Sequence, residues 1–186
     1  MSSLAPGDGA LFVLPSQRVQ AKIVSWRRIY DPEHWRTIPP HITVAYPFVR
    51  YDDWPEVQPA FSACLQAFQP FWITLAQLGA FESPQTVLWF RPDDGGMLTR
   101  IHAALAERFP AHVQAGPLGF VPHLTVGFFD SAAAMAQAKA TIEGIWRPLR
   151  FRVRSLCYAT LHDDGIWRTC DGLSLGGRQP GRVNDR

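Results

Sequence analysis

The sequence of 186 residues is poor in cysteine, has no long apolar run and carries no strong excess of charge of either sign. Its three cysteines, Cys64, Cys157 and Cys170, are far apart and lack metal-type spacing, which argues against a disulfide framework or a zinc site. No stretch approaches the ~18 apolar residues of a membrane span, and residues 1–10 lack the basic start and apolar run of a secretory signal. We therefore expect reduced thiols and a cytoplasmic protein that does not contact membranes.

The charge balance also limits the class of binding partner. The 18 basic and 16 acidic residues leave a formal net charge of +2, well short of a protein that coats long nucleic acid through charge alone. A short or small anionic substrate is a better match. With 47% hydrophobic residues, the chain can bury a sizeable core as one globular domain or two closely packed lobes.

The sequence does contain one short motif in two copies. Pro40-His41-Ile42-Thr43-Val44 in the first half returns in the second half as Pro122-His123-Leu124-Thr125-Val126. From the composition of this chain, two copies are expected by chance roughly once in a million such sequences. The duplication therefore indicates a common function for the two segments.

Alternation of side chains along a strand predicts one polar and one apolar face for each copy. The predicted polar faces carry His41, Thr43 and Ala45 in the first copy, and His123, Thr125 and Gly127 in the second. The predicted apolar faces, which we expect in the core, carry Ile42, Val44 and Tyr46, and Leu124, Val126 and Phe128. Each polar face thus has an imidazole, a hydroxyl one pleat along, and then a residue too small to block access.

Two imidazoles that face one phosphodiester can divide the acid/base work. A neutral ring takes a proton from the attacking water or hydroxyl, and a protonated ring gives one to the leaving oxygen, each transfer contributing typically ~10²–10⁴-fold. We expect His41 and His123 in these roles, and the hydroxyls of Thr43 and Thr125 as donors to the phosphate oxygens. This scheme requires neither a metal nor a cofactor.

The order of predicted elements repeats as well. Each half reads strand, helix, motif strand, helix, strand, and the second half ends in a hairpin predicted from a long strand at 149–161 and another strand at 166–175. We expect a single domain over 1–175 with lobes near 10–81 and 85–175, related by an approximate two-fold axis, and exchange of terminal elements between them remains open. Residues 176–186 have few apolar side chains, and we expect a mobile tail.

The paired phrases HITV (residues 41–44) and HLTV (residues 123–126) resemble the 2H phosphoesterases, in particular the 2'-5' RNA ligase or cyclic phosphodiesterase branch. The resemblance covers about 10–175 and implies an α+β, bilobal fold with two antiparallel sheets flanked by helices and a central cleft. It also implies hydrolysis of 2',3'-cyclic phosphates at nucleotide or RNA ends to a 2'-phosphate, and the reverse ligation that forms 2'-5' linkages. We expect a monomer that acts on a small nucleotide or a short RNA end.

Many bacterial members of this family continue the second motif with a phosphate-binding arginine, whereas this chain continues with Gly127-Phe128-Phe129. The candidate replacements are Arg91 and the alternating Arg150, Arg152 and Arg154, although a solvated strand face is the more common explanation for such arginines. The aromatic side chains that could stack on a base are Phe129, Tyr158, Trp167 and Tyr46, of which Tyr46 is disfavoured because alternation turns it toward the core.

The other histidines have simpler explanations. We expect His34 and His112 at the surface, His102 as a packing histidine on a helix, and His162 in a hairpin turn. Two alternatives to the enzyme hypothesis remain open at this point. One is a module that binds a phosphorylated RNA end or nucleotide without turnover, and the other is a metal site at the motif histidines, for which the motifs offer a poor ligand set.

Overall fold

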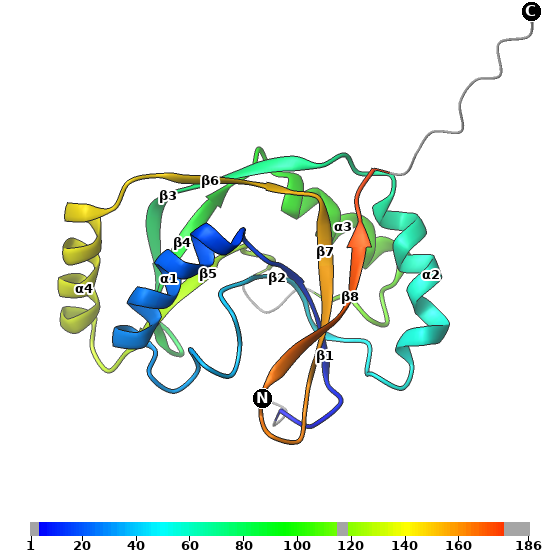
Figure 1. Ribbon diagram of the computed structural model, residues 1–186, viewed down its shortest axis with the longest axis horizontal. Helices are drawn as coiled ribbons and strands as arrows, with labels where there is room; N and C mark the ends of the chain where they lie inside the picture. Colours follow the sequence, from blue (N-terminus) through cyan, green and yellow to red (C-terminus); the bar gives the residue numbers. More distant parts are fainter. Residues whose placement is uncertain (1–3, 115–118, 177–186) are drawn as a thin grey trace, which may run out of the picture.

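The computed structural model describes residues 4–114 and 119–176, which form eight β-strands and four α-helices (Figure 1). The strands are β1 (Gly9–Val13), β2 (Ile42–Phe48), β3 (Phe71–Phe81), β4 (Thr86–Asp93), β5 (Leu124–Phe129), β6 (Leu149–Val153), β7 (Ser155–Leu161) and β8 (Trp167–Ser174). The helices are α1 (Gln17–Tyr30), α2 (Trp54–Leu65), α3 (Met97–Arg108) and α4 (Ala132–Ile145). The expected α+β class is confirmed, and the tail expected at 176–186 lies outside the described residues except for Gly176.

The strands form two four-stranded antiparallel sheets, in the orders β2-β1-β7-β8 and β5-β4-β3-β6. These sheets do not follow the two halves of the chain. Strand β3, from the first half, pairs with β4 and β6, whereas β7 and β8, from the second half, join the sheet of β1 and β2. Each sheet thus has its motif strand at one edge, next to the first strand of the same half and then a strand donated by the other half.

The prediction of one continuous strand at 149–161 is wrong. The chain forms two strands, β6 and β7, because it leaves one sheet and enters the other at Arg154. The buried positions show where this happens. Phe151 and Val153 are buried in β6, but the next buried side chains are Leu156 and Tyr158, so the alternation changes parity between the two strands. A continuous strand could not turn both sets of side chains toward the core.

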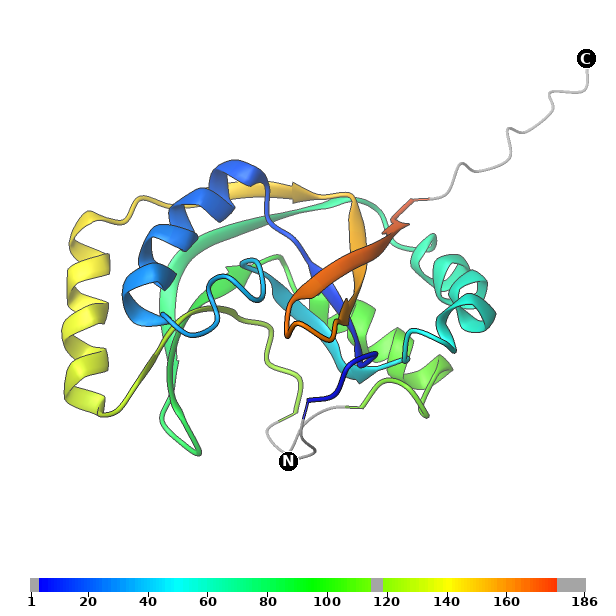
Figure 2. The same ribbon diagram turned by 60° about the horizontal axis from the view of Figure 1, so that its bottom comes forward.

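The helices pack in pairs at opposite ends of the molecule, α1 beside α4 and α2 near α3, as both views show (Figures 1 and 2). Helix α1 contacts β5 and α3 contacts β2, so the helix that precedes each motif strand lies on the motif strand of the other half. One hydrophobic cluster includes buried side chains from both sheets and from all four of these helices. Within 4–114 and 119–176, none of the helices is long and apolar enough to cross a bilayer.

Both motif strands contain a β-bulge directly after the threonine. In β2 the partners of Leu11 and Phe12 are Ala45 and Thr43, which leaves Val44 as the extra residue. In β5 the partners of Leu88 and Trp89 are Gly127 and Thr125, which leaves Val126 as the extra residue. An extra residue reverses the alternation that follows it.

The bulges overturn the expected orientation of four side chains. Ala45 and Gly127 are buried, and Tyr46 and Phe128 are exposed, with 39% and 38% of their surface accessible. The expectation that Tyr46 and Phe128 face the core is therefore wrong. Strict alternation fails because it assumes one residue opposite one residue along the whole ladder.

Gly127 is the point where α1 comes closest to β5. A Cβ at this position would overlap the Cβ and the carbonyl oxygen of Tyr30. We expect Gly127→Ala to lower the free energy of unfolding by about 1–3 kcal/mol, since backbone atoms must move to admit the methyl group. Gly144→Ala is the matched control, because Gly144 lies in α4 with nothing near its Cβ position, and it should raise the free energy by about 0.5–1 kcal/mol. Urea titrations of the two variants measure both values, and equal effects would contradict the contact.

Candidate active site

The two motif copies meet in one cavity of about 930 Å³ that is lined by His41, Thr43, His123 and Thr125. His41 and Thr43 come from the start of β2, and His123 and Thr125 from the start of β5, so each sheet supplies one imidazole and one hydroxyl. Direct contact between β2 and β5 brings these edges together. The volume is at the upper end of the range for small-molecule sites, which leaves room for a nucleotide.

The two histidines are held by the same hydrogen bond. Nδ1 of His41 lies 2.8 Å from the carbonyl oxygen of Pro39, and Nδ1 of His123 lies 2.8 Å from the carbonyl oxygen of Val121. A carbonyl oxygen only accepts, so Nδ1 donates its proton in both rings. In the neutral state, the lone pair of each ring is then on Nε2, the atom that can exchange a proton with a substrate.

The environments of the two rings differ. The pKa of His41 is lowered to about 4, mainly by burial, with the positive charges of Arg27 and protonated His123 acting in the same direction and the Pro39 carbonyl and Asp31 opposing them. The ring packs against Phe12 with 4.1 Å between centroids. Both rings are therefore neutral at neutral pH in the absence of a ligand, because burial also lowers the pKa of His123 below its usual 6.5.

His123 has an aromatic environment of its own. Its ring lies edge-on to Phe81, with 5.1 Å between centroids, and Trp89 is the next nearest aromatic ring at 6.0 Å. These side chains displace water from around the imidazole, which is the physical cause of its lowered pKa.

A buried ion pair lies in the wall of the cavity. Arg27 and Asp31, both on or next to the last turn of α1, are 3% and 2% exposed and are joined by hydrogen bonds of 3.0 and 2.7 Å to one carboxylate oxygen. The other oxygen of Asp31 lies 2.7 Å from Nδ1 of His34. Of the arginines in the described part of the chain, Arg27 is the one that lines this cavity. The sequence analysis missed this pair, although the i,i+4 spacing at a helix end was a visible signal.

Four of the candidate contact residues, Tyr158, Phe129, Arg152 and Arg91, do not line the cavity. Tyr158 is fully buried, stacks on Trp54 and donates its hydroxyl proton to the carbonyl oxygen of Val49 at 3.0 Å. Phe129 packs against Tyr30 in the core cluster, since the bulge in β5 turns it away. Arg152 is exposed on β6, opposite Trp72 in the ladder. These three residues and Arg91 therefore lie outside the cavity that holds the motif histidines.

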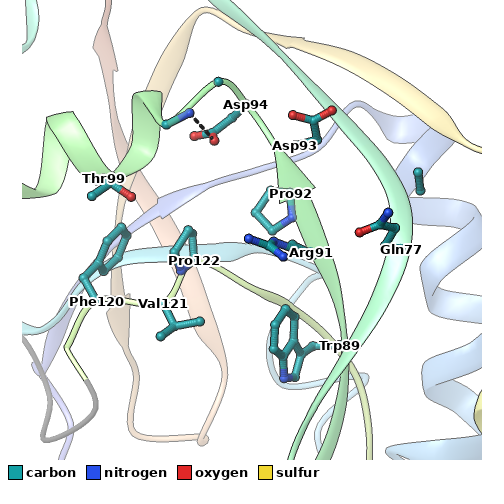
Figure 3. Close-up of a pocket in the computed structure, with 13 residues that line it drawn as sticks. Gln77, Trp89, Arg91, Pro92, Asp93, Asp94, Thr99, Phe120, Val121 and Pro122 are labelled. Atoms are coloured by element: carbon teal, nitrogen blue, oxygen red, sulfur yellow. Dashed lines mark hydrogen bonds between the residues drawn. The ribbon is translucent and has the colours of Figure 1, made fainter.

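Arg91 lines a separate cavity of about 610 Å³ (Figure 3). Gln77 lies opposite Arg91 in the β3–β4 ladder, and both line this cavity together with Trp89 and Pro122 (Figure 3). Trp89 also lies near the ring of His123, at 6.0 Å between centroids, and Pro122 directly precedes His123 in the chain. This second cavity is thus lined by two neighbours of His123, but none of the four motif His and Thr side chains lines it.

Two of the aromatic side chains that line the main cavity, Tyr46 and Phe128, are ones that strict alternation had assigned to the core. Tyr46 lines it together with Trp167, whose ring lies edge-on at 5.9 Å between centroids. Phe128 lines it on the side of β5, in T-shaped contact with His34 at 5.5 Å. Tyr46 and Phe128 occupy equivalent places after the two bulges, so the duplication extends to a pair of aromatic rings.

The remaining histidines divide between the cavity and the core. His34 is exposed, as expected, and His162 lies in the expected hairpin turn between β7 and β8, yet both line the cavity. His102 is a packing histidine, as expected: it is 6% exposed, stacks on Phe120 and donates from Nδ1 to the carbonyl oxygen of Val44 at 2.8 Å. Within 4–114 and 119–176, no group of three or more His, Cys, Asp or Glu side chains is arranged to hold a metal ion.

Comparison with known families decides where this arrangement belongs. A family model for the 2'-5' RNA ligase superfamily matches residues 15–165, which include both motif strands and all four helices. The chain belongs to this superfamily. Curated relatives named as candidate phosphoesterases, from Bacillus mycoides (strain KBAB4) and Bacillus cereus (strain ATCC 10987), are each 30% identical over 118 residues, which span 63% of this chain and 67% of theirs.

Solved structures show the same fold. The crystal structure of Escherichia coli LigT without ligand aligns with a TM-score of 0.61 over 92% of this chain and 99% of that chain, at 18% identity. LigT bound to 3'-AMP aligns with a TM-score of 0.60 over 93% and 100% of the two chains, at 16% identity. At this level of identity the likeness concerns the fold, which in this superfamily member places both motifs at one cavity.

Proposed function

We propose that this member of the 2'-5' RNA ligase superfamily is a metal-independent phosphodiesterase that hydrolyses 2',3'-cyclic phosphates or 2'-5' linkages of nucleotides or RNA ends. The observation that carries the proposal is the matched pair His41 and His123, whose Nδ1 atoms are both bonded to backbone carbonyls beside one cavity. The names of the Bacillus relatives and the 3'-AMP and ATP complexes of LigT support a phosphoesterase that acts on nucleotides.

Hydrolysis of a 2',3'-cyclic phosphate needs two proton transfers and one water, which two histidines can serve. One neutral imidazole takes a proton from water as its oxygen bonds to phosphorus, and the bond from phosphorus to the 3'-oxygen breaks. The second imidazole, protonated, gives its proton to that 3'-oxygen, which leaves a 2'-phosphate. Thr43 and Thr125 donate hydrogen bonds to the non-bridging oxygens, where negative charge develops.

The unequal environments of the rings support one division of the two roles in this direction. His41 has the lower pKa, about 4, and stays neutral over the whole neutral range, as a base must. The pKa of His123 is lowered less strongly, and the negative charge of a bound phosphate beside the ring favours its protonated form. We therefore propose His41 as the base and His123 as the acid for hydrolysis, with the roles reversed for ligation.

The aromatic side chains of the cavity support a position for the nucleobase. Tyr46 and Trp167 form an aromatic wall on the side of His41. Rings of this kind stack on any base, with about 1–3 kcal/mol per base lost on alanine substitution. We propose that the base of the substrate lies against this wall.

The pH dependence of kcat/KM tests the assignment. This ratio should rise as the pH climbs through about 4, because His41 must lose its proton to act as base, and fall above the pKa of His123, which lies below 6.5, because the acid is then deprotonated. Its optimum thus lies below pH 6.5, whereas the falling limb of kcat lies at higher pH, since the bound phosphate stabilises the imidazolium. Initial rates across the acid and neutral range give both profiles, and a flat kcat/KM profile would contradict two-histidine catalysis.

A turnover assay tests the proposed function itself. Adenosine 2',3'-cyclic phosphate and a 2'-5' dinucleotide are incubated with purified protein in excess chelator, and products are separated by chromatography. We expect the 2'-phosphate from the cyclic substrate at an undiminished rate in chelator. Binding without product in calorimetry would instead support a non-catalytic phosphate-binding module, and loss of turnover in chelator would support a metal-dependent reaction.

A further inference from the structure

His34 is a third imidazole at the cavity, outside both motifs and not used by the mechanism above. It lies in the turn between α1 and β2, lines the same cavity as His41 and His123, and has 51% of its side chain exposed. Its ring contacts Phe128 edge-on, at 5.5 Å between centroids. It is therefore both accessible and placed against a cavity wall.

The ring is aimed by a buried network. Nδ1 lies 2.7 Å from one oxygen of Asp31, whose other oxygen accepts from both Nε and Nη2 of Arg27. Arg27 in turn donates from Nη1 to the carbonyl oxygen of Ile38 at 2.8 Å, so both ends of the 31–38 turn are attached to one guanidinium. With Nδ1 held at the carboxylate, Nε2 points away from the buried pair.

The net charge of Arg27, Asp31 and a protonated His34 is positive, which favours binding of an anion. Arg27 already neutralises Asp31, so a protonated His34 adds one positive charge that no described carboxylate cancels through a second ion pair. An imidazolium between the Asp31 carboxylate and a phosphate oxygen would make a charge-assisted hydrogen bond on each side. Glu33 and Asp130 border the adjoining depression of about 540 Å³ and disfavour an anion there, whereas the main cavity is lined by Arg27 as well as by Asp31 and Asp163, so the main cavity is the better place for the anion on Nε2.

We propose that His34, positioned by Asp31 and Arg27, binds a second phosphate group of the substrate, distinct from the phosphate that reacts. This inference rests on the proposed function and narrows its substrate class. In a ribonucleotide whose 2',3'-phosphate lies between His41 and His123, the other phosphate is the one on the 5'-oxygen. The preferred substrates are therefore 5'-phosphorylated nucleotides or RNA 3' ends rather than nucleoside 2',3'-cyclic phosphates.

Calorimetry with two product-like ligands tests this position without turnover. Adenosine 2',5'-bisphosphate should bind the wild-type protein about tenfold more tightly than adenosine 2'-phosphate, which is the effect of one charge-assisted hydrogen bond. His34→Gln, which cannot carry the positive charge, should reduce the difference to about twofold or less. His112→Gln is the matched control, because His112 packs near Phe61 and does not line the cavity, and it should keep the tenfold preference.

The outcomes separate this proposal from the proposed function. Equal affinity of the wild type for the two ligands, or an unchanged preference in His34→Gln, would overturn the second phosphate position. Hydrolysis of adenosine 2',3'-cyclic phosphate is measured on the same wild-type sample. If hydrolysis is present and the preference absent, the second position alone fails. If the preference is present without hydrolysis, the proposed function fails and the anion position at His34 is supported.

Discussion

Alanine in place of His41 should lower kcat for a 2',3'-cyclic nucleotide by about 10²–10⁴-fold. The reason is that no other described side chain offers a neutral Nε2 in the same place. His41 is held by the Pro39 carbonyl and enclosed by Phe12, and burial keeps its pKa near 4. Steady-state kinetics with adenosine 2',3'-cyclic phosphate measure the loss.

The matched control for this variant is His112→Ala, which removes an imidazole outside the cavity and should leave kcat within about twofold of wild type. The kcat of the double variant His41→Ala with His123→Ala should be little lower than that of the less active single variant, because the effects of groups that act as one unit are not additive. Ordinary turnover by a folded His41→Ala protein would remove this residue from the chemistry. Circular dichroism shows whether each variant is folded.

Methionine in place of Arg27 should lower the free energy of unfolding by about 3–5 kcal/mol. The side chains of Arg27 and Asp31 are only 4% and 1% exposed, so loss of the guanidinium leaves a buried carboxylate without its partner. The same change frees the carbonyl oxygen of Ile38 and loosens the turn that carries His34. Chemical denaturation followed by tryptophan fluorescence measures the change.

The chain contains a matched surface pair for comparison. Arg50 and Asp8 are also 2.7 Å apart, but their side chains are 51% and 22% exposed, so Arg50→Met should cost about 1 kcal/mol or less. The double variant Arg27→Met with Asp31→Asn should recover part of the loss, because it no longer buries an unpaired charge. If Arg27→Met and Arg50→Met destabilised the protein equally, burial would not be the source of the effect.

The elements that depend on local residue order were predictable. The order strand, helix, motif strand, helix, strand was predicted for each half, and the structure has this order in β1-α1-β2-α2-β3 and in β4-α3-β5-α4-β6. The placement of His41 and Thr43 on one strand face followed from alternation, and both line the cavity. These features need only the period of side chains along a few residues.

The bulges could not be predicted in the same way. Val44 and Val126 look like ordinary strand residues, and only the strand paired with each shows that one residue is unmatched. As a result Tyr46 and Phe128 were assigned to the core when they line the cavity. The direction of a side chain beyond a bulge depends on a partner strand that is remote in sequence.

The sequence by itself determined that two equivalent strands carry His41 and Thr43, and His123 and Thr125, within an α+β protein. Only the tertiary structure decided which strands join which sheet, and that the buried pair of Arg27 and Asp31 lies in the cavity wall beside them. It also made the two equivalent histidines unequal, because a pKa depends on how much water is excluded and which charges lie near. Those quantities come from contacts between remote segments, which the order of neighbouring residues does not contain.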